Sequence, residues 1–398
     1  MPEWFRALFP SLETRVHLAC CSHAPRSAPM KAAMELMLDD LERDQPWPLF
    51  ETKLVELRGL LAELLGCVPR QLSLQPNASI AAFQVASSMD WRQRPRIVTC
   101  RAEFPSLAQV WKAQEQRGAE LLLLDAPVDA DALLQAYGQA IDERVGLVSV
   151  PALDFVGGTR LPVREIAALA HRQGARVFCD AYQLIGTEPV DAVGLDLDYL
   201  VGGTMKYLLG LPGQAFLYAR QPVDVQRCSL LTGWQGRRDP FAFDPLALDH
   251  PIDSARRFET GTPAIAPAYA AVAGLGVLLD LGLQRIALRI AELKTLASVC
   301  LAALDMERLL VAPPAACGAH IALRLDDASR ALALEQHLRE HHIQVSPRRE
   351  ALRLAFHAYN EVEDIDRLSE ALCAARARGL VPPYRARAAQ RAQKAHKA

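Results

Sequence analysis

The chain has 398 residues, enough for two or three domains and a large buried core. Hydrophobic residues make up 51% of it and charged residues 23%, and 44 basic against 46 acidic residues leave a net charge of −2. This composition excludes disordered, collagen-like and disulfide-scaffold proteins. The near-zero charge also argues against nucleic acid or an anionic membrane as a partner.

Short apolar segments alternate with amphipathic ones in the first two thirds of the chain. Helical spacing is clear at 161–174. The alternation predicts an α/β domain with a doubly wound, mostly parallel sheet. The strands are nearly all apolar, which is typical of a sheet covered by helices on both faces. The predicted strands are 72–74, 96–100, 120–125, 145–150, 175–180, 197–201 and 214–219.

Beyond about residue 265 the pattern changes to that of a smaller α+β domain. We therefore divide the chain into a large domain at 1–265, with an entry segment at 1–30, and a small C-terminal domain at 266–380. A basic, flexible tail follows at 381–398, read as a frayed helix rather than a partner-binding site. The predicted elements of the small domain are helices 264–283, 284–304, 328–341 and 361–378 and strands 319–325, 343–346 and 351–355.

Neither membrane insertion nor secretion is expected. No apolar run reaches the ~18 residues that a bilayer span requires, and charges and prolines interrupt the first 15 residues, unlike a signal peptide. The nine cysteines form an odd, scattered set without a CxxC pair, which argues against a disulfide framework and a zinc ribbon. We expect a cytoplasmic protein with reduced cysteines and no metal.

Two predicted strands end in residues that can do chemistry together. Strand 175–180 ends in Asp180, and the next strand runs into a glycine-rich loop that holds Lys206. Alone, the acid would be a helix cap and the lysine a solvated loop residue. Ligands of such sheets bind beyond the carboxyl ends of the strands. A ring cofactor held as a Schiff base on a lysine needs an acid at its ring nitrogen, and this pair meets that need.

The segment DAYQLIGTEPVDAVGLDLDYLVGGTMKYLLGLPGQAFLYAR resembles the signature of the class V aminotransferases, which are fold-type I pyridoxal phosphate enzymes. The family includes kynureninases, cysteine desulfurases, selenocysteine lyases, isopenicillin N epimerase-like proteins and transaminases. The resemblance extends over about 15–378. It implies pyridoxal 5′-phosphate as cofactor, Lys206 as the Schiff-base lysine, Asp180 as the partner of the pyridine nitrogen and Gln183 as a hydrogen-bond partner of the ring phenolate.

Further segments match the family's cofactor contacts. By resemblance, the N–H of Ala78 and the hydroxyl of Ser79, in QPNASIAA, bind the phosphate at a helix N-terminus. Phe104, in AEFPS, stacks on the pyridine ring, and Thr204 supplies a phosphate-binding hydroxyl. Asp154, in ALDFVGG, lies near the phenolate. Each match has a structural alternative. The segment around Ala78 and Ser79 could be a helix cap without a ligand, Phe104 could belong to the core, and Asp154 could be a turn residue.

Two loops match segments that family members use across a dimer interface. Trp234, in GWQG, is expected at the phosphate edge. Gly261 and Thr262, in RRFETGTPAI, are expected to contact the phosphate of the other subunit. Ordinary loop packing is the alternative for all three. The resemblance therefore implies a homodimer with shared active sites.

The substrate contacts come from both ends of the chain. Arg353, in ALRLAFHAYN, matches the arginine that clamps the substrate α-carboxylate. Ser22 and His23, in VHLACCSHAP, match a turn that reaches the substrate. Arg348 and Arg349 either favour an acidic substrate side chain or are solvated. We expect a small-molecule amino acid as the ligand.

The type of reaction is less clearly indicated. Persulfide-forming desulfurases carry a nucleophilic cysteine in a long loop before the carboxylate arginine, but no cysteine lies between Cys317 and Cys373. Gln183 and Met205 stand where kynureninases or other relatives carry His or Tyr. Met205 argues against the kynureninase reaction itself. Gln183 and the short loop before Arg353 resemble relatives that include C–S lyases, so they favour a lyase that cleaves at Cβ, C–S or C–C, without a persulfide. Aminotransferase or epimerase is the alternative, and a non-catalytic binding protein is a distant third because Lys206 and Asp180 are both present.

Overall fold

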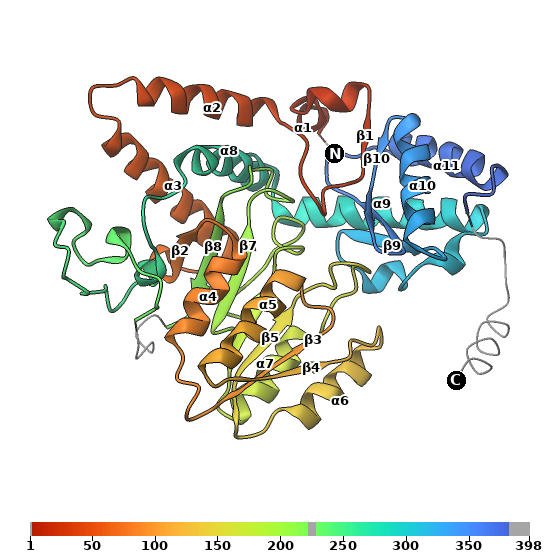
Figure 1. Ribbon diagram of the computed structural model, residues 1–398. Helices are drawn as coiled ribbons and strands as arrows, with labels where there is room; N and C mark the ends of the chain where they lie inside the picture. The colour runs from red at the N-terminus through yellow and green to blue at the C-terminus, as the bar shows by residue number, and fades with distance from the viewer. Residues whose placement is uncertain (1, 222–227, 382–398) are drawn as a thin grey trace.

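The computed structural model describes residues 2–221 and 228–381, so most of the predicted basic tail, 382–398, lies outside the described residues. In the described part, a seven-stranded sheet has the order β2-β8-β7-β6-β5-β3-β4 (Figure 1). The predicted α/β class with a mostly parallel sheet is confirmed. The strands are β2 (Leu72–Gln75), β3 (Arg96–Cys100), β4 (Glu120–Leu124), β5 (Val145–Pro151), β6 (Arg176–Asp180), β7 (Tyr199–Gly203) and β8 (Ala215–Ala219).

Strand direction brings the chemically important strand ends to one edge of the sheet. Strands β4, β3, β5, β6 and β7 are parallel to one another. Strand β8 is antiparallel to both β7 and β2, so β2 runs in the same direction as β7. The carboxyl ends of β2, β3, β5, β6 and β7 therefore lie at the same edge, where ligands of such sheets bind.

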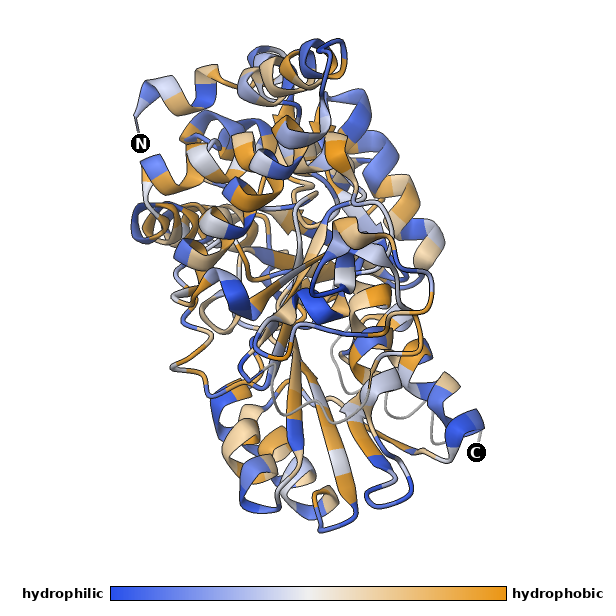
Figure 2. Ribbon diagram, turned by 90° about the vertical axis from the view of Figure 1, so that its left-hand side faces the viewer, coloured by the Kyte–Doolittle hydropathy of each residue, from blue (hydrophilic) through white to orange (hydrophobic). Residues whose placement is uncertain are grey.

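Helices cover both faces of the sheet, as the apolar strands predict (Figure 2). One core cluster includes Val85, Trp111 and Phe178, and the other includes Leu61 and Ile166. Edge strand β4 departs from the prediction, because its side chains are partly exposed. The helices of this part are α2 (Ala28–Leu41), α3 (Trp47–Leu65), α4 (Ala78–Ser88), α5 (Pro105–Ala113), α6 (Ala130–Ala140), α7 (Val163–Arg172) and α8 (Ile265–Leu281).

The remaining elements form the smaller α+β part. An antiparallel sheet has the order β11-β12-β9, and the short strand β10 pairs in parallel with β1 from the N-terminal segment. Helix α8 packs on α2 and α3 of the large part, and α9 leads from there into the small part (Figure 1). The elements are β1 (Val16–His17), α9 (Leu283–Ala303), β9 (His320–Arg324), α10 (Ala328–Glu340), β10 (Ile343–Gln344), β11 (Ser346–Arg348), β12 (Ala351–Ala355) and α11 (Val362–Ala377).

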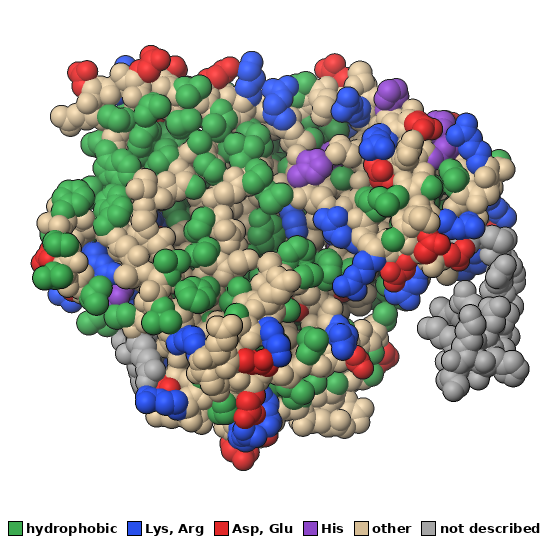
Figure 3. Space-filling model, in the orientation of Figure 1, with side chains coloured by type: hydrophobic (Ala, Val, Ile, Leu, Met, Phe, Trp, Pro, Cys, Tyr) green, Lys and Arg blue, Asp and Glu red, His purple; other side chains and the backbone are tan. Residues whose placement is uncertain are grey.

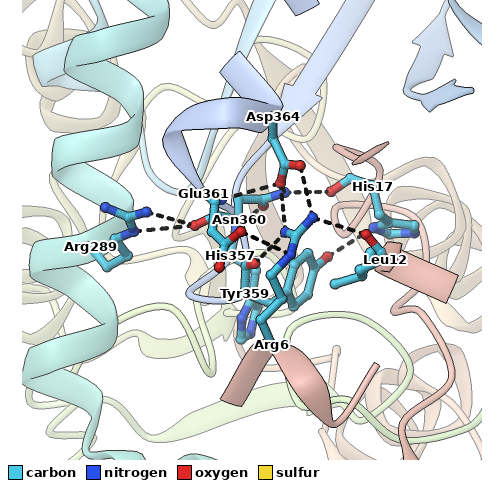
Figure 4. Close-up of polar contacts among 9 residues, drawn as sticks. All are labelled: Arg6, Leu12, His17, Arg289, His357, Tyr359, Asn360, Glu361 and Asp364. Atoms are coloured by element: carbon cyan, nitrogen blue, oxygen red, sulfur yellow. Dashed lines mark hydrogen bonds and ion pairs between the residues drawn. The ribbon is translucent and has the colours of Figure 1, made fainter. Parts of the chain in front are cut away.

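A buried polar network ties the N-terminal helix α1 (Glu3–Ala7) to the small part (Figure 4). Arg6 donates two hydrogen bonds to the Asp364 carboxylate, at 2.9 and 3.0 Å. Asp364 also accepts from the Asn360 amide at 2.9 Å, and that amide donates to the carbonyl oxygen of His17 at 3.1 Å. This network and the β1–β10 pairing hold the entry segment in the position from which it reaches the site described below.

Helices long and apolar enough to cross a membrane singly are not found among the described residues. Helices α8 and α9 meet the length and composition criteria only as a pair, which is bent by 81°.

Candidate active site

Lys206 lies in the loop between β7 and β8, and its amine is beside two aromatic rings. The Nζ atom is 4.5 Å from the centre of the Tyr182 ring and 5.8 Å from that of Phe104. Burial lowers the pKa of Lys206 to about 8, and the charge of Asp180 partly opposes this shift. A lysine with such a pKa has a substantial neutral fraction near pH 8, as a nucleophile or a general base requires.

Asp180 is a buried acid at the carboxyl end of β6. Burial raises its pKa, while the N–H of Tyr182, 2.9 Å from Oδ1, and the positive charge of Lys206 lower it. A buried carboxylate is stabilised when a cation lies within hydrogen-bond reach. The protonated pyridine nitrogen of pyridoxal phosphate is such a cation, so this acid fits that cofactor.

Gln183 joins the strand end to the entry segment. Its amide nitrogen donates to the carbonyl oxygen of Cys21 at 3.1 Å. Its amide oxygen is buried and has no hydrogen-bond partner among the described residues. Because unpaired buried polar atoms are uncommon in native proteins, this atom is a further indication that a polar ligand belongs here.

Phe104 and the start of α4 lie at the same edge of the sheet. Phe104 precedes α5 and is 38% exposed, which leaves part of this large apolar ring uncovered. Its ring makes an edge-to-face contact with Phe155, with centroids 5.2 Å apart. Helix α4 starts at Ala78, next to Ser79, and the first N–H groups of a helix have no partner inside it. An uncovered ring and a helix N-terminus suit the ring and the phosphate of the cofactor.

Two of the predicted cofactor residues are engaged in their own loops. The carboxylate of Asp154 accepts the N–H groups of Val156 and Gly157 at 3.0 and 2.8 Å, which is the turn alternative stated above. Asp154 also lines a cavity of about 720 Å³. The hydroxyl of Thr204 is fully buried and lies 3.1 Å from two backbone carbonyl oxygens. The Thr204 hydroxyl thus donates to the backbone rather than offering a free donor for a phosphate, and the Asp154 carboxylate is held by its own turn.

Arg353 and Ser22 are in contact although they lie 331 positions apart in the sequence. The Nη2 atom of buried Arg353 donates to the hydroxyls of Ser22 at 2.9 Å and Ser346 at 2.6 Å. Its Nη1 atom donates to the carbonyl oxygen of Phe155 at 2.8 Å. The structure thus brings together two of the three predicted substrate residues, and Arg353 is among the charges that lower the pKa of Lys206. His23 is exposed, with its Nε2 atom 3.0 Å from the Gln344 amide.

Trp234, Gly261 and Thr262 form a separate group. The Trp234 ring lies 5.5 Å from that of Trp47, and Gly261 and Thr262 are exposed. None of the contacts found among residues 2–221 and 228–381 joins these three residues to Lys206. Within one chain, the structure therefore does not bring them into the site.

Two residues near the lysine were not singled out from the sequence. Tyr182 is one, with its ring packed over Gly203, where a side chain carbon would lie 2.2 Å from the phenol oxygen. Glu103 is the other. Its buried carboxylate accepts from Ser149 Oγ at 2.7 Å and from the N–H of Phe104 at 3.0 Å. The sequence signal for both was their position just after a strand end, next to residues already chosen.

Glu103 is an unusual acid because it lies near a second one. Burial and the negative charge of Asp180 raise its pKa to about 8. Trp111 donates to the hydroxyl of Ser149 at 3.0 Å, so Glu103, Ser149 and Trp111 form one buried chain of hydrogen bonds behind Phe104. At neutral pH we expect Glu103 to hold a proton, which leaves Asp180 as the charged acid of the pair.

The fold and the lysine–acid pair together place the chain among the α/β enzymes that hold pyridoxal phosphate on a lysine. The family model described as Aminotransferase class-V matches residues 53–368. The chain therefore belongs to the class V aminotransferase family and is a pyridoxal phosphate-dependent enzyme.

The chain is similar to several known proteins. It is 31% identical to the uncharacterized aminotransferase YcbU of Bacillus subtilis (strain 168), over 92% of this chain and 95% of that protein. It is 30% identical to the kynureninase of Deinococcus radiodurans over 56% of this chain, and spans about half of that protein, 54%. A solved structure of a C-DES mutant, with glycine linked covalently to its PLP cofactor, has a TM-score of 0.84 at 20% identity. It covers 94% of this chain and 99% of that one.

Proposed function

We propose that this enzyme cleaves a C–S or C–C bond at Cβ of an α-amino acid, after Lys206 has removed the proton from Cα. The observation that carries the proposal is the Lys206 amine, with a pKa of about 8, close to Asp180 and Arg353. A partly neutral amine can both link to the cofactor aldehyde and accept a proton near neutral pH.

The residues around the lysine would hold the cofactor by complementary chemistry. Asp180 would pair with the ring nitrogen, Phe104 would pack on the ring, and Gln183 would contact the ring oxygen. The N–H of Ala78 and the N–H and hydroxyl of Ser79 would bind the phosphate. When bound, pyridoxal phosphate supplies a ring that accepts electrons from Cα. The negative charge of Asp180 would hold the proton on the ring nitrogen. A protonated ring accepts electrons from Cα more readily, so a charged Asp180 favours the reaction.

Arg353 would orient the substrate. Its guanidinium is buried and is held by Phe155 and Ser346 on the protein side. A substrate carboxylate would take the place of the Ser22 hydroxyl, or would share the guanidinium with it, by a charge-assisted hydrogen bond. With the carboxylate fixed there, Cα lies on the side of Lys206, which is close enough to Arg353 for their charges to interact.

The shape of the β11–β12 hairpin supports cleavage without a persulfide. Only Arg349 and Glu350 separate β11 from β12, so this hairpin has no room for a long loop. Cys317 is buried, with Sγ 3.6 Å from the carbonyl oxygen of Gly157. Burial raises the pKa of its thiol to about 11, which makes a reactive thiolate rare at neutral pH.

Transamination is the second candidate, and the similarity to YcbU, named as an aminotransferase, favours it. The first proton transfer is the same in both reactions. In a cleavage, the bond at Cβ then breaks and its leaving group departs, whereas in a transamination Lys206 returns the proton to the cofactor instead of to Cα. A return to Cα from the opposite face would give an epimerase.

A spectral titration of the purified enzyme with single amino acids, in the absence of a keto acid, tests the proposal. We expect the visible band of the lysine-linked cofactor to persist while the cleavage products accumulate over many turnovers: keto acid and ammonia after elimination of the Cβ group, or alanine where a proton replaces that group. Bleaching with one keto acid per site would instead identify an aminotransferase, and formation of the other enantiomer an epimerase. The Lys206→Ala variant should lack the band. A wild-type protein without the band after addition of the cofactor would refute the assignment of Lys206.

A homodimer belongs to the same proposal. Figure 3 shows hydrophobic side chains gathered on the side that α2, α3 and the segment around 228–252 occupy in Figure 1. Large exposed patches of this kind mark interaction sites, and Trp234, Gly261 and Thr262 lie in or beside this region. The exposed apolar residues there are Leu36, Leu38, Leu41, Val55, Leu230, Leu231, Phe241, Phe243, Leu246, Leu248 and Ile252.

Sedimentation analysis tests the dimer. We expect twice the mass of the chain for the wild type, and a larger monomer fraction for Phe243→Asp, because a charge would then have to be buried in the interface. A substitution at exposed Leu332, on α10, should leave the mass unchanged. A wild-type monomer that is fully active would contradict a shared site.

A further inference from the structure

A second arginine lies beside the substrate clamp. Nη2 of Arg348 approaches the hydroxyl of Ser22 to 3.5 Å, and Nη2 of Arg353 donates to the same hydroxyl at 2.9 Å. Two guanidinium groups thus converge on one small polar side chain. Burial and the charge of Arg353 both lower the pKa of Arg348, as expected for a cation beside another cation. Arg348 also contributes to the lowered pKa of Lys206, so all three cations share one local field.

The two arginines form no ion pair with an acid among the described residues, whereas Lys206 lies near Asp180. Among the ion pairs formed by residues 2–221 and 228–381, none involves Arg348 or Arg353. The other hydrogen bond of the Arg348 side chain goes to the carbonyl oxygen of Pro347, at 3.0 Å. Placing like charges together without a counter-charge is unfavourable, and a ligand with matching negative groups relieves it.

The two arginines differ in a way that suggests different tasks. Arg353 is buried and held by backbone and hydroxyl groups, as suits a fixed contact to a group common to all substrates. Arg348 is exposed at the end of β11. Its long side chain can therefore adjust to the substrate's side-chain group, which differs from one amino acid to another. Its neighbour Arg349 lines the 720 Å³ cavity together with Asp154, whereas Arg348 does not.

We propose that Arg348 binds a second negative group of the substrate, so that this enzyme prefers α-amino acids with an acidic side chain, a carboxylate or a sulfinate. The inference rests on the proposed function, in which Arg353 takes the α-carboxylate. The inference holds for cleavage at Cβ and for transamination alike. It concerns substrate binding, which comes before the step at which the two reactions differ. Arg348 is thus a specificity residue, and it needs no role in proton transfer.

Calorimetric titration of the cofactor-loaded enzyme with succinate and with its monoamide, succinamate, tests the inference without turnover. The two probes have nearly the same shape and differ by one negative charge. We expect succinate to bind about tenfold more tightly at low salt, as one charge-assisted hydrogen bond allows, and the advantage to shrink as salt screens it. In Arg348→Ala the advantage should fall below about twofold. Arg349→Ala, the neighbouring control, should keep it.

Each result decides the question. Equal affinity for the two probes in the wild-type enzyme, or an unchanged succinate preference in Arg348→Ala, would overturn the role of Arg348 while leaving the proposed function intact. A protein that never acquires the cofactor's visible band would overturn the proposed function first. Arg348→Lys, which keeps the charge but not the forked geometry, should retain part of the preference if the interaction is electrostatic.

Discussion

Replacing Glu103 with glutamine should change how the stability of the protein depends on pH. Glu103 is buried, 3% exposed, and lies behind the ring of Phe104. Ser149 donates to the Glu103 carboxylate at 2.7 Å, and a protonated carboxyl or a glutamine amide can form the same contact with the direction reversed, so Glu103→Gln preserves shape and the hydrogen-bonded pair. The difference is that the amide cannot titrate. The substitution therefore isolates the contribution of one buried acid.

The sign and the size follow from the pKa of this residue. An ordinary glutamate has a pKa of 4.5, whereas burial and Asp180 raise that of Glu103 to about 8. Between these values the folded protein keeps a proton that the unfolded chain releases, so a rise in pH favours unfolding. The stabilising effect is complete below about pH 4.5 and is lost by about pH 8. Each pH unit costs at most ~1.4 kcal/mol, which gives about 2–3 kcal/mol between about pH 5.5 and about pH 7.5.

Urea unfolding of both proteins across this range measures the effect. We expect the wild type to lose about 2–3 kcal/mol more than Glu103→Gln between the two pH values, and the difference to stop changing above about pH 8. The comparison cancels the shared titrating groups that do not interact with Glu103, so the measured difference belongs to Glu103 and to its interacting neighbour Asp180. A difference between wild type and variant that stays constant with pH would show that Glu103 is ionised in the folded state, and would refute the reasoning.

Three further substitutions, and a fourth that serves as a control, have defined outcomes. Asp180→Asn should retain the cofactor but lower turnover about 10²–10³-fold, measured by product formation, because the ring nitrogen loses its charged partner. Phe104→Ala should weaken cofactor affinity about 2–10-fold in an absorbance titration, the range of one aromatic stacking contact. Asp364→Ala should lower the free energy of unfolding by about 2–3 kcal/mol, since it removes the buried carboxylate that accepts from Arg6 and Asn360. Removal of exposed Glu35, which pairs with Lys31, should cost less than about 1 kcal/mol. Equal losses from Asp364→Ala and Glu35→Ala would contradict the buried network.

The sequence alone determined where most strands and helices of the α/β part lie. Strand β3 spans the predicted 96–100, and α7 lies within the predicted 161–174. These elements are predictable because apolar periodicity is a local property, visible within a dozen residues. Asp180 and Lys206 could be chosen for the same reason, since parallel strands bring their carboxyl ends to one edge.

The tertiary structure decided which side chains meet. The contact between Ser22 and Arg353 joins residues 331 positions apart, and it depends on the β1–β10 pairing and on the Arg6–Asp364 network. No local pattern encodes such a contact. The same is true of the hydroxyl of Thr204, which suited a phosphate in the sequence but lies against backbone carbonyl oxygens in the fold.

Burial is the second property that the sequence could not supply. The shifted pKa values of Lys206 and Glu103 arise chiefly from desolvation, which depends on every element packed around them. The sequence thus determined which chemical groups are present and on which strand ends they lie. Only the packed structure decided their charges and their partners, because both depend on contacts between segments that are distant along the chain.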